Sequence, residues 1–394
     1  MLSNKTIQIV KSTAPALAEK GLEITNCMYH NMLSNEPEIK KMFNISHQRS
    51  GLQPKALANA VYAYAQNIDN LSALTDAVEV MAAKHVASQI KAEHYPIVGK
   101  YLLAAIDQVL APGQEILDAW QSAYQFLADI LIAREHILYK QQKDQAGGWP
   151  GFREFIVSDK VVESDCITSF YLVPKDQKSI AKHLPGQYIT ISLDIPQGQY
   201  KRQYSISSVP NDKYYRISVK KENTPCGIVS NYLHEEIQLQ DSIHLSAPTG
   251  NFYLKDNDKP VVLLSAGVGL TPMLSMLSFL LEQNPTKPIY FIHATNNSQS
   301  HAMRTDIDRL ALKYPNLHIF YSYSQPLEKD IQHQTMHKTG RIDMDWLHHI
   351  LPGNDCDYYF CGPQSFMQMV QQTLHHWQVP AQQINYEVFG PQMA

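Results

Sequence analysis

The chain has 394 residues, of which 44% are hydrophobic and 18% charged, and its 33 basic and 37 acidic residues give a net charge of −4. At about 150 residues per domain this length predicts two or three globular domains, and the composition excludes a disordered or fibrous chain. The slightly acidic balance argues against nucleic acid as the main partner.

The cysteines and the apolar segments indicate the cellular compartment in which we expect the protein. Five cysteines occur, an odd number, without a C-x-x-C pair, so we expect a reducing, cytoplasmic location with neither a disulfide framework nor a zinc ribbon. Residues 1–20 hold no apolar run that would make a secretory signal. The uncharged segment 260–281 contains Gly267, Gly269 and Pro272, so we expect a strand, a glycine turn and a helix there rather than a membrane span. We expect a monomer.

Residues 1–140 are predicted to form an all-α domain. Apolar residues recur at helical spacing over residues 53–68, 97–110 and 112–140, and no strand-like alternation interrupts them. The stretch 141–151 is first polar and then rich in glycine and proline, which is typical of a linker.

The second half of the chain changes character twice. Residues 152–258 hold short β-rich runs separated by turn residues, with one short helix at about 228–236, and this predicts a small antiparallel β-barrel or sandwich. From residue 259 to 394, apolar strands alternate with helices, which predicts an α/β domain with a parallel sheet. The expected fold is therefore multidomain: all-α, then all-β, then α/β.

Two polar residues of the α domain lie on apolar helical stripes. His85 shares a face with Val78 and Met81, and Glu135 follows Leu131 by one helical turn. A lone histidine there is usually a satisfied core or surface residue, and a lone acid is usually an edge residue or a salt-bridge partner. Together they suggest an imidazole whose second nitrogen is bound by a carboxylate, which is the usual support of a metal-bound histidine.

The order of further residues resembles the globin domain of the flavohaemoglobins. On the side away from His85 the matching residues are Tyr29, Phe43, Gln53 and Leu57. The resemblance implies that Tyr29 and Gln53 line the distal side of a haem pocket, with Leu57 between them and the iron, and that Phe43 packs on the haem face. Each of these residues alone is more often core packing.

The same resemblance assigns the proximal side. It implies that His85 is the haem-iron ligand and that Tyr95 and Glu135 hydrogen-bond around it. A carboxylate behind the imidazole makes the ligand more electron-donating, which favours activation of dioxygen over simple carriage. The resemblance also implies that Lys84 is a charged partner on the globin side, and that Glu387 lies on the path to the haem.

The β domain resembles the FAD domain of the ferredoxin-reductase family. The run PGQY at 185–188, the R-x-Y-S motif at 202–205 and a glycine turn before a helix at 227–230 occur in family order. R-x-Y-S alone is more often plain sheet. Cys226 stands where relatives have a second glycine, which is tolerable if its φ is negative. The resemblance implies FAD contacts from these residues: Tyr188, Arg202, Gln203, Tyr204, Ser205, Gly227, Val229, Ser230 and the C-terminal Phe389.

The α/β domain resembles the NAD(P) domain of the same family. Its G-x-G-x-T-P run lacks the third glycine of the dinucleotide fingerprint but is the variant that this family uses. Helix-start N–H groups suit a phosphate. His301 and Arg304 follow the second strand, where they either meet a 2′-phosphate or are solvated helix residues. The resemblance implies NAD(P) contacts from these residues: Gly267, Val268, Gly269, Leu270, Thr271, Pro272, Cys361, Gly362 and Pro363.

The complete resemblance, in family order, implies a nitric oxide dioxygenase with haem b, FAD and NADH or NADPH. NAD(P)H would reduce FAD, FAD would reduce the haem iron, and the ferrous-oxy haem would convert nitric oxide to nitrate. Two alternatives use the same electron chain. One is an NAD(P)H-dependent alkyl hydroperoxide reductase, and the other is a non-enzymatic oxygen-binding or oxygen-sensing globin whose reductase keeps the iron ferrous.

Overall fold

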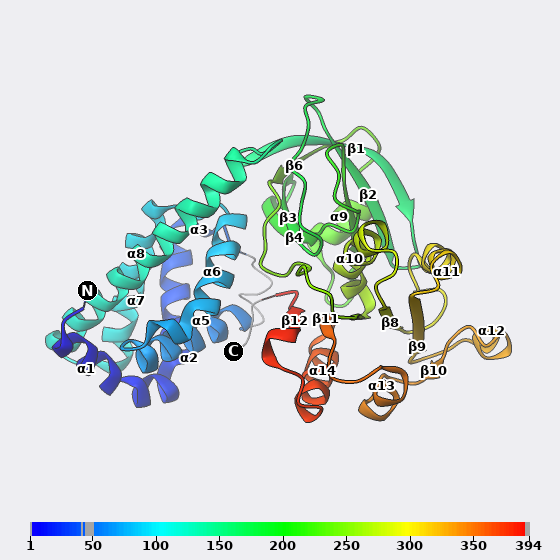
Figure 1. Ribbon diagram of the computed structural model, residues 1–394. Helices are drawn as coiled ribbons and strands as arrows, with labels where there is room; N and C mark the ends of the chain where they lie inside the picture. Colours follow the sequence, from blue (N-terminus) through cyan, green and yellow to red (C-terminus); the bar gives the residue numbers. More distant parts are fainter. Residues whose placement is uncertain (1, 41, 44–50, 391–394) are drawn as a thin grey trace.

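The computed structural model of the chain describes residues 2–40, 42–43 and 51–390. Figure 1 shows a helical domain on the left, a β-barrel at the upper right and a sheet with helices below it. The expected fold class, all-α followed by antiparallel β and then parallel α/β, is confirmed.

The helical domain confirms the three sequence patterns. Its described helices are α1 (Asn4–Ser12), α2 (Ala14–Asn35), α3 (Pro37–Lys40), α5 (Leu52–Asn67), α6 (Thr75–Ala87), α7 (Tyr95–Leu110) and α8 (Gln114–Asp144), with short 3-10 turns at Leu71–Leu74 and Ala92–His94. Helix α2 packs on α5 and α7, while α8 packs on α1, α6 and α7. Since α6 packs against α8, side chains on their facing stripes meet.

The segment predicted as a linker is anchored at both ends. Helix α8 continues past residue 140 to Asp144. The Gln142 amide donates to the Ala247 carbonyl at 3.3 Å, and the Trp149 indole donates to the Leu245 carbonyl at 3.0 Å. Gln142 and Trp149 are each 6% exposed. A polar, Gly/Pro-rich composition signals an irregular chain, but it does not reveal such specific anchoring to the barrel.

The barrel is one antiparallel sheet whose edges meet. Its strand order is β4-β3-β6-β1-β2-β5, and a single bridge from Ile206 to Ile217 links the edge regions. Phe155, Phe170 and Tyr215 are fully buried in its core. The helix expected near 228–236 is α9 (Ile228–Glu235). The strands are β1 (Phe152–Val162), β2 (Ile167–Pro174), β3 (Tyr188–Ile195), β4 (Gly198–Ser205), β5 (Tyr215–Lys220) and β6 (Ser242–Ser246).

The last domain is a parallel sheet with strand order β10-β9-β8-β7-β11-β12. The chain runs outward from β7 (Val261–Ala266) through β8 (Ile289–Thr295), β9 (Leu317–Tyr323) and β10 (Lys338–Thr339). It then returns to β11 (Asp357–Cys361) and β12 (Ile384–Glu387). The order therefore reverses between β7 and β11, and ligands of such sheets bind outside the carboxyl ends of the strands at this point.

The α/β domain includes short elements that sequence periodicity did not predict. Helices α10 (Leu270–Gln283), α11 (Arg304–Lys313) and α14 (Gln364–His376) follow strands, whereas α12 (Glu328–Gln332), α13 (Met344–Ile350) and β10 are short additions. The uncharged segment 260–281 is β7, a glycine turn and α10, as expected. Within the described residues, none of the helices has the length and apolarity needed to cross a bilayer.

A buried polar contact ties the barrel to the α/β domain. His183 is 2% exposed, and its Nε2 lies 3.1 Å from both the Ser208 carbonyl and Ser275 Oγ, which is on α10. The Ser275 hydroxyl also donates to the Ser208 carbonyl, at 2.7 Å. Burial lowers the pKa of His183 to about 4, so the ring is neutral at physiological pH and donates from Nε2 to the carbonyl.

Candidate functional site

His85 lies in the last turn of α6 with one ring nitrogen held. Its Nδ1 is 2.7 Å from Glu135 Oε1 on α8 and 3.0 Å from the Tyr95 hydroxyl, and Tyr95 also donates to Glu135. Glu135 is 2% exposed and Tyr95 7%. Because a carboxylate only accepts, Nδ1 carries a proton, and in the neutral form of the ring the lone pair is on Nε2.

The other nitrogen of His85 fits a metal ligand. No hydrogen bond to Nε2 is found within the described residues, and 31% of the side chain is exposed. A neutral imidazole with a free Nε2 lone pair, and with a buried carboxylate on Nδ1, is the arrangement that metal-binding histidines use. The donor chemistry of His85 would therefore let this residue hold a haem iron.

Tyr29 and Gln53, the residues expected on the distal side, come together from α2 and the first turn of α5. Their side chains are hydrogen-bonded, and Tyr29 is 7% exposed. Burial raises the pKa of Tyr29 well above its usual range, and the hydrogen bond from Gln53 offsets this only in part. The Phe43 ring lies edge-on to Tyr29 at 5.6 Å. Leu57 follows Gln53 by one turn of α5, so it lies on the same helix face.

In the barrel the expected flavin residues line two paired strands. Tyr188 on β3 is opposite Ser205 on β4, and the next pairs along β4 join Tyr204, Gln203 and Arg202 to β3. Side chains alternate along a strand, so Arg202 and Tyr204 share one face of β4. The Arg202 guanidinium lies 5.7 Å from the centre of the Tyr200 ring.

The glycine turn expected at the FAD phosphates begins α9. Gly227 is the N-cap of this helix, and Val229 and Ser230 are buried in its first turn. The first N–H groups of a helix have no internal partners and suit a phosphate. Cys226 is exposed and is not among the residues with positive φ, so the condition for tolerating it in place of glycine is met.

The two motifs of the α/β domain meet at the carboxyl ends of β7 and β11. A Cβ on Gly269 would lie 2.1 Å from the Cys361 carbonyl oxygen and 2.8 Å from the Gly362 nitrogen, so the two turns touch there. Gly267 adopts φ +54°, and a Cβ there would meet open space. Leu270, Thr271 and Pro272 form the buried start of α10. The open turn in front of a helix start suits a dinucleotide phosphate.

The C-terminal segment of the α/β domain contacts the globin domain at α6. Glu387 on β12 pairs with Cys361, and the Lys84 ammonium donates to the Gly390 carbonyl at 3.1 Å. Burial raises the pKa of Glu387 to about 7, against the opposing charge of Lys84. Phe389 lies between these contacts and is 46% exposed. Figure 1 shows β12 on the side of its sheet that faces the globin domain.

The structure excludes one of the two alternatives expected for His301 and shows the contacts of Arg304. His301 is 4% exposed, so it is not a solvated helix residue, and its Nδ1 lies 2.8 Å from the Tyr323 hydroxyl. Arg304 donates to the same hydroxyl at 2.9 Å and pairs with Asp308. Helical periodicity did not reveal this burial, because His301 lies in the loop before α11 and packs edge-on against Tyr321.

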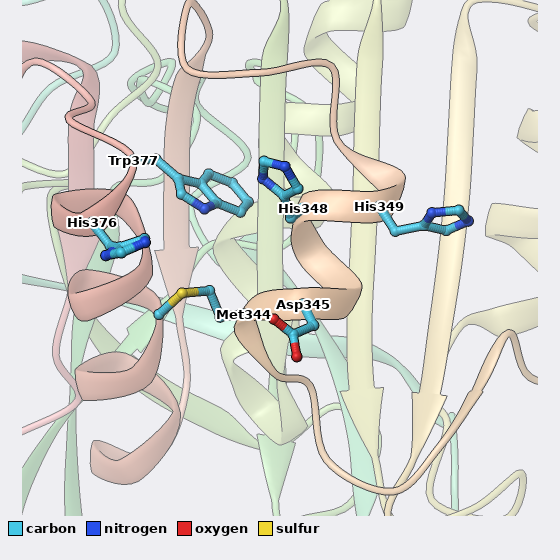
Figure 2. A pocket seen from close by; sticks show the side chains of 6 residues that line it. All are labelled: Met344, Asp345, His348, His349, His376 and Trp377. Carbon is cyan, nitrogen blue, oxygen red and sulfur yellow. The ribbon is translucent and has the colours of Figure 1, made fainter.

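A separate pocket lies between α13 and α14, away from these residues. It has a volume of about 650 Å³, and Figure 2 shows side chains from both helices around it. The His348 ring packs edge-on against Trp377 at 5.5 Å. No predicted site residue lines this pocket, and no group of three or more His, Cys, Asp or Glu among the described residues is arranged to hold a metal. The lining residues are Met344, Asp345, His348, His349, His376 and Trp377.

Comparisons with known families divide the chain in the expected order. The Globin family matches residues 26–131, the Oxidoreductase FAD-binding domain matches 154–253, and the Oxidoreductase NAD-binding domain matches 263–372. Together with the folds described above, these matches make the protein an NAD(P)H-dependent oxidoreductase with haem, FAD and a nicotinamide dinucleotide as cofactors.

Similar proteins cover the full length. A Flavohemoprotein of Bacillus cereus is 47% identical over 397 residues and one of Bacillus subtilis is 43% identical over 399, each alignment covering at least 99% of both chains. A flavohemoglobin of Malassezia yamatoensis, solved with bound FAD and heme, has a TM-score of 0.87 at 26% identity, over 99% of this chain and 100% of that one.

The reductase part has a solved relative of its own. The flavohem-like FAD/NAD binding domain of a nitric oxide dioxygenase from Vibrio cholerae is 38% identical, with a TM-score of 0.56, and covers 61% of this chain and 99% of its own. The globin domain, the two reductase domains and the full-length relatives agree. The chain therefore belongs to the flavohemoprotein family.

Proposed function

We propose that the protein is a nitric oxide dioxygenase, which uses NAD(P)H and dioxygen to convert nitric oxide to nitrate. Haem supplies a redox-active iron, FAD converts hydride equivalents into single electrons, and the nicotinamide supplies the hydride. The observation that carries the proposal is that one helical domain holds both a His85 backed by a buried carboxylate and a buried Tyr29 that is hydrogen-bonded to Gln53. The five free cysteines support a reducing, cytoplasmic location.

On the proximal side, Glu135 holds a proton at Nδ1 of His85. The carboxylate is buried and accepts from both the imidazole and Tyr95, so its charge draws the Nδ1–H toward it and raises the electron density at Nε2. A strongly donating nitrogen ligand would favour activation of dioxygen over its storage. Tyr95 orients the carboxylate and stays neutral, because burial and Glu135 raise the pKa of its hydroxyl well above the usual range.

On the distal side, Tyr29 presents a hydroxyl that keeps its proton. With its pKa raised by burial, it remains an O–H donor at neutral pH, and Gln53 orients it. A buried donor of this kind stabilises negative charge that develops on a ligand. Phe43 packs against Tyr29 and restricts its ring. We propose that these residues hold dioxygen and exclude water while nitric oxide enters.

The reductase residues supply the electrons. We propose that Arg202 and the start of α9 bind the FAD pyrophosphate, that Tyr188, Tyr204 and Ser205 contact the flavin, and that the turns after β7 and β11 bind NAD(P)H. The alternation of β4 and the close contact of the two glycine turns support this arrangement. The contact of Lys84 with the C-terminal segment supports an electron path toward α6.

The test is NADH oxidation by the purified, cofactor-loaded protein in air, with and without a nitric oxide donor, while nitrate is counted. We expect fast oxidation coupled to one nitrate per nitric oxide. Slow oxidation that ignores nitric oxide and leaves a stable oxygen complex would contradict the proposal and favour the oxygen-binding alternative. NADH-dependent loss of an alkyl hydroperoxide without nitrate formation would favour the peroxidatic one.

Substitution of His85 tests its proposed role, and substitution of His136 is the matched control. His85→Ala should abolish stoichiometric haem binding and nitrate production while NADH still reduces the flavin. His136→Ala removes an exposed histidine of α8, next to Glu135 in sequence, and should leave both unchanged. A six-coordinate haem spectrum in His85→Ala would remove His85 from the proposed role.

A further inference from the structure

Both reductase domains contact the same turn of the globin domain. The last turn of α6, which carries His85, begins with Lys84, whose ammonium binds Gly390 of the C-terminal segment. At the end of this turn, the Ser88 carbonyl accepts from the Lys201 ammonium of β4 at 3.2 Å. The first contact involves a residue that the family resemblance had singled out. No sequence motif points to the second.

The end of α6 accepts a hydrogen bond from outside the globin domain. Gln89 follows the helix with φ +61°, the left-handed conformation that favours glycine. The turn is closed by Ile90 N–H on the His85 carbonyl at 2.9 Å, and by the Gln89 backbone and side chain on the Val86 carbonyl, each at 3.1 Å. The Ser88 carbonyl receives the charged donor of Lys201, and a cation at a helix C-terminus also interacts favourably with the helix dipole.

Lys201 lies beside the expected flavin contacts. Its own carbonyl accepts from the Arg202 guanidinium at 2.7 Å, and its ammonium is 5.3 Å from the centre of the Phe152 ring. Successive side chains of a strand point to opposite faces. Arg202 is therefore on one face of β4, while Lys201 reaches the globin domain from the other face. The same strand thus carries a proposed flavin-binding residue and a residue that binds the end of α6.

We propose that Lys201 is a positioning residue that seats the FAD-binding barrel on the turn carrying His85 and thereby sets the rate of electron transfer from flavin to haem. In each transfer the flavin loses one electron and the iron gains one, and NADH replaces the electrons lost. Lys201 exchanges neither electrons nor protons. The proposal rests on the roles proposed for His85 and Arg202, and it is independent of nitric oxide chemistry.

The experiment compares Lys201→Met, which keeps the length but removes the donor, with Lys201→Arg, which restores a cationic donor. Lys213→Met is the matched control, since Lys213 is an exposed lysine of the same barrel. In anaerobic stopped flow, NADH bleaches the flavin, and carbon monoxide traps the reduced haem. Hydrogen exchange of the amides over residues 84–90 is measured on the same proteins.

Lys201→Met should leave flavin bleaching unchanged but slow haem reduction. Amide exchange over residues 84–90 should accelerate about fivefold, the factor expected when a hydrogen bond worth about 1 kcal/mol is lost. Lys201→Arg should recover most of both effects, and Lys213→Met should behave as the parent protein. Unchanged haem reduction and unchanged exchange in Lys201→Met would overturn the proposal, as would equal slowing of flavin bleaching. Absent nitrate formation in the parent would contradict the proposed function alone, because neither readout here uses nitric oxide.

Discussion

The two nitrogens of His85 differ in their proposed roles. Nδ1 is held by the buried Glu135 carboxylate, and Nε2 is the nitrogen proposed to hold the haem iron. Glu135→Gln keeps the size of the side chain but removes the charge that accepts from Nδ1 and from Tyr95. We expect the reduction potential of the haem to rise and turnover to fall about 10- to 100-fold, as for other partners of metal-bound histidines. Spectroelectrochemical titration and nitrate counting measure both effects.

The control for this substitution lies between the same two helices. Glu79 on α6 pairs with Arg134 on α8 at 2.7 Å and is partly exposed. Glu79→Gln should leave the potential unchanged. If both variants shifted the potential equally, the packing of α6 on α8 would be responsible rather than the charge behind His85.

On the distal side, Tyr29→Phe removes one hydroxyl from a buried site. Losing a hydrogen bond of about 1.4 kcal/mol should speed dioxygen dissociation roughly tenfold. Tyr64→Phe is the matched change, because Tyr64 is also a buried tyrosine but its hydroxyl donates to the Ala123 carbonyl at 2.8 Å. Stopped-flow displacement by carbon monoxide measures the off-rates. A tenfold increase in Tyr64→Phe and none in Tyr29→Phe would exclude Tyr29 from oxygen binding.

The candidate site residues could be identified from sequence motifs, but most of the contacts that each of them makes could not. The Tyr29–Gln53 hydrogen bond and the Glu135–His85 contact join segments far apart in the chain. Polar residues on apolar helical stripes suggested the Glu135–His85 contact, whereas only the resemblance brought Tyr29 and Gln53 together. His301 shows the limit of local reasoning. It precedes a helix, where polar residues are usually exposed, yet the rings of Tyr321 and His293 cover it.

At the scale of elements, replacing glycine by alanine should have opposite effects in a tight turn, at Gly269, and in a helix, at Gly21. Gly269→Ala would place a methyl group 2.1 Å from a backbone carbonyl that cannot move freely. We expect a loss of about 1–3 kcal/mol in the free energy of unfolding, typical of overpacking, and a higher KM for NADH. Thermal unfolding and steady-state kinetics of the cofactor-loaded protein measure these.

Gly21→Ala in α2 is the contrasting case. The new Cβ would lie 3.5 Å from Ala58 Cβ, an ordinary contact. Alanine is the better helix former by about 1 kcal/mol, so this variant should be as stable as the parent or more so. A destabilised Gly21→Ala with an unaffected Gly269→Ala would refute the contact between the two turns of the α/β domain.

Long periodic elements were predictable and short ones were not. Strands β7, β8, β9 and β11 are runs rich in apolar and aromatic residues between turn residues, which is why these strands could be anticipated. Helices α12 and α13 and strand β10 hold too few residues to show a period. The end of α8 was also missed, because its last residues are polar and their contacts come from the barrel. The domain boundaries at residues 140, 151 and 258 stay a prediction.

At the scale of the whole molecule, a buried histidine makes stability depend on pH. His183 is neutral between the barrel and α10, with its pKa lowered to about 4 by burial. The unfolded chain, with a histidine pKa of about 6.5, binds more protons between these values, so stability is lost as the pH falls from about 6.5 toward 4. At pH 5 the loss should be about 2 kcal/mol, at 1.36 kcal/mol per pKa unit.

Chemical denaturation of the parent and of His183→Gln from pH 7.5 to 5 tests this. The stability difference between them should shrink by the stated amount as the pH falls, while exposed His136→Gln should track the parent throughout. A constant difference between the parent and His183→Gln would mean that the ring is not buried neutral between the domains.

The long helix α8 also constrains how this architecture can tolerate insertions and fusions. Its 31 residues run without a break from the globin core to Asp144 and include Gln142, which is held by the barrel. Each residue of a helix turns the next by about 100° and advances it by 1.5 Å. One amino acid inserted before Gln142 would therefore rotate the haem domain against its electron source, whereas insertion within residues 145–148, beyond the helix, would not. A haem domain exchanged onto this reductase must end in a helix of matching phase.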